Sequence, residues 1–183
     1  MAKRFWFGMS VIMLAFAVTV IGCDNGGNDD VRSIHGTWVN EEGAEITFHA
    51  GGDWTEYFEG SPMMRGTFAT NDDSITMVIT ELHSNFINEV LEEMGDFLSG
   101  LSAPHGWYSS AQIRALIAAG LSLADIPPEE AEIILVLFVD TMLAGLFAPQ
   151  DGTFSIRGNT LTITVTVTVD GFTVTETSTL TRR

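Results

Sequence analysis

Two stretches of the chain, about 34–82 and 152–181, consist of short runs in which apolar and polar residues alternate. An alternation with a period of two places successive side chains on opposite faces of an extended strand, so both stretches are predicted to form β-strands. Turn-forming residues separate the runs, as at Gly51-Gly52-Asp53 and Asn71-Asp72-Asp73. The pattern predicts five strands in the first stretch and three in the second.

The last two runs are predicted to form a hairpin. Asp170-Gly171 lies between them, and this dipeptide favours a two-residue turn. Val169 then pairs with Phe172, and the same register brings Leu161 opposite Leu180. The register is self-consistent over the whole length of both runs.

The hairpin register also places a carboxylate on the apolar face. Glu176 shares that face with Val165 and Val174, which we expect to form the interior. A lone buried carboxylate is costly. Three explanations therefore remain open: Glu176 pairs with Arg65 or Arg157, it lines a wet cavity and contacts a ligand, or the face assignment is wrong.

The residues at about 84–150 have helical rather than strand periodicity. Apolar residues from Phe86 to Leu101 recur at helical spacing, and acidic residues take the other face. A second helix is expected to begin near Ser109 or Ser110. A third is expected from Pro128 to Ala148, because proline and acidic residues suit a first turn.

The third helix contains the run EIILVLFVDTMLAGLF, Glu132 to Phe147, which is apolar nearly all round. Such a helix is expected to be buried, with Ile133 to Val139 packed against the barrel or against the first helix. Two other interpretations remain open. The helix could be a lid at the mouth of the barrel, or the insertion could present a surface that docks a protein partner.

An internal repeat relates the two β-stretches. GTFATNDDSITMVIT, from Gly66, aligns without gaps on GTFSIRGNTLTITVT, from Gly152, at an offset of 86 residues. The offset implies that Thr80 and Thr166 end equivalent strands. We therefore predict a mainly β fold over 34–183: an eight-stranded antiparallel barrel with a three-helix insertion between strands five and six.

The first and last strands carry a resemblance to a known family. Gly36-Thr37-Trp38 resembles the Gly-x-Trp motif of lipocalins, and Arg182 matches the arginine that packs over that tryptophan. The resemblance implies that Gly36, Trp38 and Arg182 close the barrel. It also implies non-enzymatic binding of a small apolar or amphipathic ligand, with these candidate lining residues: Trp38, Trp54, Phe58, Phe68, Phe154 and Glu176.

The amino-terminal residues read as an export signal. Lys3 and Arg4 precede an apolar run, and the segment ends in Val20-Ile21-Gly22-Cys23. This ending resembles the lipobox of bacterial lipoproteins, in which the cysteine thiol receives diacylglycerol and its amine can receive a further acyl chain such as palmitate. We expect a signal peptide at 1–22, lipidation at Cys23 and a flexible tether over 23–33. The alternatives are a cleaved signal followed by a free thiol, or an uncleaved membrane anchor.

Composition and charge argue against several classes of function. The chain has 24 acidic and 8 basic residues, and loss of Lys3 and Arg4 would leave a net charge of −18. Such a surface repels nucleic acid, so no nucleic-acid partner is expected. The four histidines have no paired-ligand spacing, and we found no catalytic constellation. We expect no metal, no cofactor and no enzyme activity, but a protein of the cell envelope anchored by lipid to the inner or outer bacterial membrane.

Overall fold

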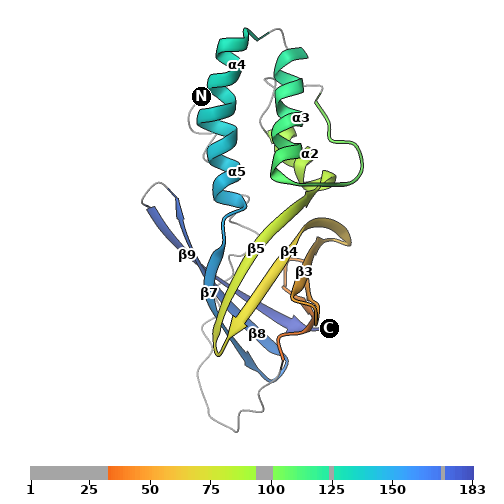
Figure 1. Cartoon of the computed structure of the whole chain (residues 1–183). Coiled ribbons are helices and arrows are strands. Elements are labelled where there is room, and N and C mark those ends of the chain that lie inside the picture. Colours follow the sequence, from red (N-terminus) through yellow and green to blue (C-terminus); the bar gives the residue numbers. More distant parts are fainter. Residues whose placement is uncertain (1–32, 94–100, 124–125, 170–171) are drawn as a thin grey trace.

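A computed structural model describes residues 33–183 except 94–100, 124–125 and 170–171. The expected lipidation site, Cys23, and the signal segment lie outside the described residues. The described chain forms a β-barrel that carries helices at one end (Figure 1).

Eight antiparallel strands form the barrel, as the alternating runs predicted. Each strand pairs with the next along the chain, apart from the helical insertion after β5, and the pairing of β1 with β9 closes the ring. A ninth, two-residue strand, β6, pairs with the end of β5 outside the barrel. The strands are β1 (Gly36–Val39), β2 (Ala44–Phe48), β3 (Asp53–Phe58), β4 (Ser61–Asn71), β5 (Ser74–His83), β6 (Trp107–Tyr108), β7 (Gln150–Arg157), β8 (Thr160–Val169) and β9 (Phe172–Arg182).

The predicted register of the last hairpin is confirmed. Val169 pairs with Phe172, and Leu161 pairs with Leu180, without a shift between them. On the outer face of this hairpin the hydroxyl oxygens of Thr164 and Thr177 lie 3.0 Å apart. The alternation therefore assigns apolar residues to the interior and threonines to the outside.

The internal repeat corresponds to two equivalent hairpins, β4–β5 and β7–β8. The second strands of these hairpins end at His83 and Val169, three residues beyond the predicted ends at Thr80 and Thr166. β5 continues because Leu82 still pairs with Met64 and with Tyr108. β8 continues because Val167 and Val169 still pair with residues of β9.

The helical insertion starts directly after β5 and ends before β7. The first and second helices are α2 (Ser84–Glu93) and α3 (Ser110–Leu123). The third predicted helix is present as one continuous rod formed by α4 (Pro128–Ile134), the π-helical segment η2 (Leu135–Asp140) and α5 (Thr141–Leu146). None of the described helices is long and apolar enough to cross a membrane.

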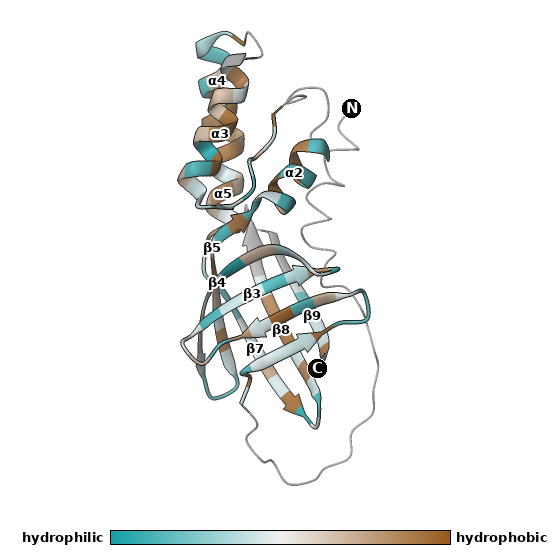
Figure 2. Cartoon of the chain, turned by 90° about the vertical axis from the view of Figure 1, so that its right-hand side faces the viewer, coloured by the Kyte–Doolittle hydropathy of each residue, from teal (hydrophilic) through white to brown (hydrophobic). Residues whose placement is uncertain are grey.

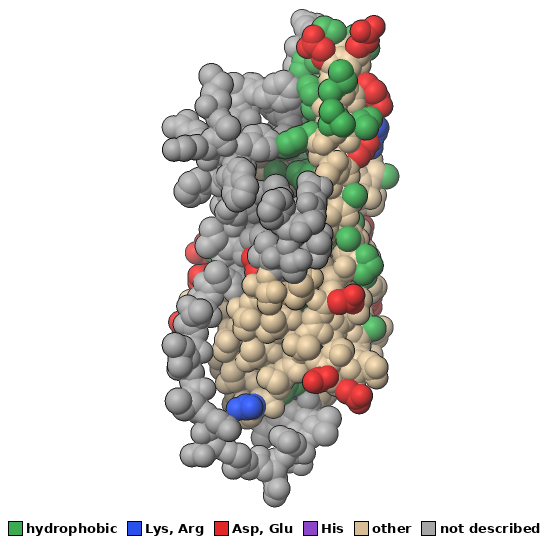
Figure 3. All heavy atoms as spheres, turned by 90° about the vertical axis from the view of Figure 1, so that its left-hand side faces the viewer, with side chains coloured by type: hydrophobic (Ala, Val, Ile, Leu, Met, Phe, Trp, Pro, Cys, Tyr) green, Lys and Arg blue, Asp and Glu red, His purple; other side chains and the backbone are tan. Residues whose placement is uncertain are grey.

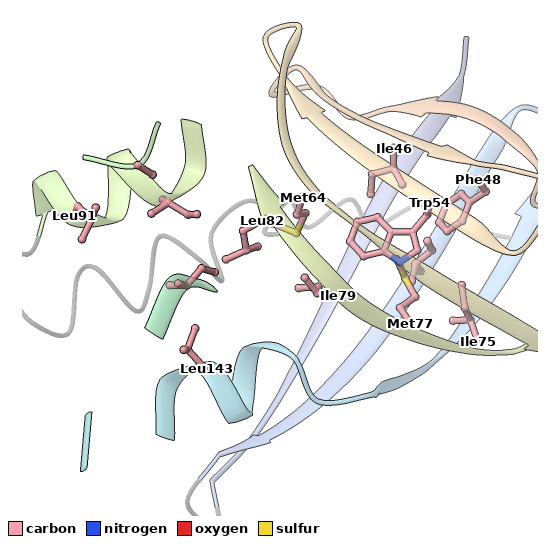
Figure 4. Packing of buried hydrophobic residues seen from close by; sticks show 14 of the residues in the cluster. Ile46, Phe48, Trp54, Met64, Ile75, Met77, Ile79, Leu82, Leu91 and Leu143 are labelled. Carbon is pink, nitrogen blue, oxygen red and sulfur yellow. The ribbon is translucent and has the colours of Figure 1, made fainter. Parts of the chain in front are cut away.

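The helices do not form a layer over the barrel wall. α2 packs on β4 and β5, whereas α3 and the α4–η2–α5 rod form a hairpin that projects from the end of the barrel (Figure 1, Figure 2). The buried residues of the barrel and of the helices nevertheless form one cluster. Figure 4 shows the transition, where Met64 and Leu82 in the barrel lead to Leu91 and Leu143 in the helices.

The expected burial of Ile133 to Val139 is wrong for three of these residues. Leu135 and Val139 are buried, but Ile133, Val136 and Leu137 are exposed by 58%, 46% and 70%. The cause is the tertiary arrangement of the helices. Because the rod projects from the barrel, α3 covers one of its faces and the described residues provide no layer for the opposite face.

Candidate functional site

The strand registers define a row of residues that crosses the inside of the barrel. Trp38 pairs with Ile46, Ile46 with Glu56, Glu56 with Met64, and Met64 with Leu82. All five are buried. Since directly opposed residues in an antiparallel sheet share a face, the one carboxylate in this row points into the barrel.

One end of the barrel is closed around Trp38. The indole N–H of Trp38 donates a 2.7 Å hydrogen bond to the carbonyl oxygen of Ile34. The guanidinium carbon of Arg182 lies 4.6 Å from the centroid of the indole ring, and Nη2 donates a 2.8 Å bond to the carbonyl of Ser33. Gly36, at φ +125°, has a backbone conformation that other residues rarely adopt. The contact that the lipocalin resemblance implied between Trp38 and Arg182 is therefore present.

Three more of the predicted lining residues lie in the barrel. Trp54 is buried, and its indole N–H donates a 3.1 Å bond to the carbonyl of Thr67. Phe68 is half-buried and meets Phe48 edge to face, with ring centroids 5.0 Å apart. Phe154 is half-buried and packs against the same core. The indole groups thus have backbone partners of their own.

Phe58 lies apart from these residues. It is the last residue of β3, directly before the turn at Glu59-Gly60, and its side chain is 38% exposed. Alternation puts Phe58 on the inner face, but at the strand end the wall no longer encloses the side chain. The expectation that Phe58 lines the interior is not met.

Glu56 is the residue that the sequence analysis missed. It is 3% exposed, and burial raises the pKa of its carboxyl from 4.5 to about 7. Its Oε2 atom has no hydrogen-bond partner among the described residues. The signal was present in DWTEYF, because Glu56 lies between Trp54 and Phe58 on the face predicted to be apolar.

Glu176 lies on the inner face, as the register predicted. It pairs with Val165, it is half-buried, and burial raises its pKa. The proposed pairing with Arg65 is wrong: the Nε of Arg65 donates a 2.6 Å bond to Glu81.

The second candidate partner for Glu176, Arg157, is also unsuitable. β7 and β9 run in the same direction, so Arg157, at the end of β7, and Glu176, in the first half of β9, lie towards opposite ends of the barrel. Arg157 is exposed there and pairs with Thr160.

Both inward carboxylates lie towards the helical end. β3 and β5 run in the same direction, and β5 leads into α2, so Glu56 is nearer to the helices than Trp54 is. β9 runs the other way, and Glu176 precedes the closed end at Arg182. Below them the barrel is packed, since Trp38, Phe48, Ile75, Leu161 and Leu180 are less than 2% exposed.

Two of the four histidines meet at the base of the insertion. The rings of His83 and His105 are 4.9 Å apart, and the ring of Trp107 is 5.0 Å from that of His83. Burial, followed by the charge of His105, lowers the pKa of His83. In the described part of the chain no three histidine, cysteine or acidic residues come close enough to hold a metal ion.

The fold and this site define a closed antiparallel barrel consistent with a lipocalin-like fold, with an unpaired carboxylate inside. Comparisons with family models, curated proteins and solved structures found no match.

Proposed function

We propose that the protein is a lipid-anchored protein of the bacterial envelope whose barrel binds a small amphipathic molecule without chemical conversion. The single observation that carries the binding proposal is Glu56, a buried carboxyl in an apolar wall with an unpartnered oxygen. An apolar residue at this position would stabilise the barrel better, because an unsatisfied buried carboxyl costs several kcal/mol.

The chemistry of Glu56 narrows the ligand class. Because the pKa of Glu56 is about 7, the group is ionised above neutral pH, and its carboxylate oxygen then accepts hydrogen bonds. Under these conditions the polar end of the ligand should be a donor, either a protonated amine or a hydroxyl. Trp38 and Trp54 already donate to backbone carbonyls, so they offer the ligand only apolar surface. Glu176 is half-buried on the same inner face, and its carboxylate, where ionised, further disfavours an anionic ligand.

Three probes of ten carbons each test this proposal: decylamine, decanol and decanoate, each below its micelle concentration or solubility limit. Binding to the full chain is followed by intrinsic fluorescence, because Trp38 and Trp54 lie inside the barrel. We expect decylamine and decanol to bind more tightly than decanoate. Glu56→Gln should weaken decylamine binding about tenfold or more, which is the usual scale for losing a hydrogen bond to a charged group.

Glu42→Gln is the matched control, since Glu42 is exposed at the turn between β1 and β2. It should leave all three affinities unchanged. If none of the probes binds, or if Glu56→Gln and Glu42→Gln behave alike, the proposed ligand site does not exist.

The anchor is a separate part of the proposal, supported by the lipobox-like ending at Cys23. Cys23→Ser removes the thiol that would be acylated. The wild-type protein should partition into the detergent phase of a Triton X-114 extraction and the variant into the aqueous phase. Equal partitioning of the two would remove the lipid anchor and leave the barrel site untouched.

A further inference from the structure

The α4–η2–α5 rod has two apolar faces, and the described residues cover only one of them. Leu135, Val139 and Leu143 are at most 6% exposed and belong to the core. Ile133, Val136 and Leu137 are the exposed set on the same rod. We refer to these three residues as the apolar patch.

The apolar patch is not a core face that has turned outwards. Arg114 of α3 bonds through Nε to Asp140 at 2.7 Å, and its Nη2 atom lies 3.8 Å from Glu132. These two contacts, together with buried Val139, fix the rotation of the rod against α3. The patch therefore remains on the outside when the helical hairpin is packed.

Acidic side chains border the patch. Glu129, Glu130 and Glu132 are exposed on the first turns of the same rod. Figure 3 shows hydrophobic side chains gathered at the helical end of the molecule with acidic side chains beside them. Residues 84–148 hold nine acidic residues and a single basic one, Arg114.

The acidic charge of the insertion indicates which kind of molecule binds the apolar patch. A second copy of the chain would bring an equally acidic insertion, and an anionic membrane would also be repelled. The apolar face of the rod that the described residues leave uncovered can pack against one further helix, as helices pack against each other in bundles. We propose that the apolar patch docks a cationic amphipathic helix, with apolar residues towards Ile133, Val136 and Leu137 and lysine or arginine towards Glu129, Glu130 and Glu132.

A pair of labelled peptides tests the proposal. Each has about 18 residues, or five turns, with leucine at helical spacing; one carries lysine on the polar face and the other glutamate. Fluorescence anisotropy should show the full chain binding the lysine peptide and not the glutamate peptide. Added salt should weaken this binding.

Substitutions locate the surface. Leu137→Ser and Ile133→Ser should each weaken binding about tenfold, the scale expected for losing one buried aliphatic side chain. Phe58→Ser is the matched control, because Phe58 is also exposed but lies on the barrel. The apolar patch is not the docking surface if Leu137→Ser binds like the wild type, or if Phe58→Ser weakens binding as much.

Two further measurements separate this proposal from its rivals. Thermal melting should be unchanged by Leu137→Ser, whereas Val139→Asp, at a fully buried position, should unfold the domain. If sedimentation shows a dimer that Leu137→Ser dissociates, the occupant is a second copy and the proposal fails. Glu56→Gln should leave peptide binding intact, so this surface and the barrel site can fail independently.

Discussion

At the residue scale, Glu56 makes the stability of the barrel depend on pH. Its carboxyl has a pKa of about 7 in the folded protein and 4.5 as an ordinary glutamate, so the folded state holds the proton more tightly. Stability should therefore fall as pH rises from about 4.5 to about 7 and level off above that. The loss is on the order of 3 kcal/mol, at about 1.4 kcal/mol for each pKa unit.

Thermal melting of the wild type and of Glu56→Gln across this pH range measures the effect. The glutamine variant should lack most of the decline and should be the more stable protein above pH 7. Because burial also raises the pKa of Glu176, the glutamine variant should keep a decline in stability of the same sign. Parallel curves for the two proteins would show that Glu56 ionises in the folded barrel as easily as in water.

Arg182 provides a second prediction at this scale. Its guanidinium stacks on Trp38 and bonds to the carbonyl of Ser33, and so ties the last strand to the start of the first. Arg182→Ala should destabilise the domain by about 1 to 3 kcal/mol through the lost cation–π contact and hydrogen bond. Arg182→Lys should recover part of this, because an ammonium keeps the charge but not the planar stacking. Urea unfolding checks the order; equal stability of all three proteins would contradict it.

The environment of some side chains could be predicted from the sequence, and that of others could not. Alternation alone put Glu176 on the inner face, and the same argument applied to DWTEYF would have found Glu56. The partner of Arg65 could not be found in this way. Arg65 lies 4.4 Å from the ring of Trp107, which the insertion brings to the barrel, and it bonds to Glu81 on the neighbouring strand.

At the element scale, the internal repeat has a steric cause. A Cβ atom on Gly66 would lie 1.9 Å from the carbonyl oxygen of Val78, and one on Gly152 would lie 2.3 Å from that of Thr164. The two glycines, and the two residues they approach, are equivalent in the repeat. Within each hairpin the two strands approach so closely at this point that only glycine fits.

Gly66→Ala should therefore cost several kcal/mol, because the obstacle is backbone on a neighbouring strand and cannot move aside. Gly145→Ala is the matched control. Nothing lies within 4 Å of a Cβ at Gly145 in α5, so alanine should stabilise the helix by up to about 1 kcal/mol. Differential scanning calorimetry should show opposite shifts in Tm; a tolerated Gly66→Ala would mean that β4 and β5 can move apart at this point.

Helices and strands could be predicted where the residues that determine them lie close together in the sequence. The hairpin of β8 and β9 follows from one turn and one alternation, and the start of the third helix follows from Pro128 and its acidic neighbours. The exposed face of that helix did not follow. The run Glu132 to Phe147 is apolar nearly all round, and only the tertiary arrangement decides which side receives a covering layer.

At the scale of the whole molecule, the barrel and the insertion are separable in topology but joined in packing. β5 and β7 are neighbours in the barrel, with Met77 opposite Gln150, so the wall does not pass through the helices. The repeat made this closure predictable, because it identified two copies of one hairpin on either side of the insertion. The continuous core through Leu82 was not predictable from it.

A deletion variant tests whether the barrel can fold without the helical insertion. β5 continues six residues beyond Met77 to His83, about 20 Å at 3.3 Å per residue, so a flexible linker of about eight residues can replace 84–148. Leu82 would lose the helices that cover it, so the variant also carries Leu82→Thr, and the full chain with Leu82→Thr is the control. We expect a β-type circular dichroism spectrum and a cooperative thermal transition, with a lower urea m-value than the control because less surface is buried. A collapsed chain without a cooperative transition would show that the helices, through Leu82 and Met64, complete the core that the barrel needs in order to fold.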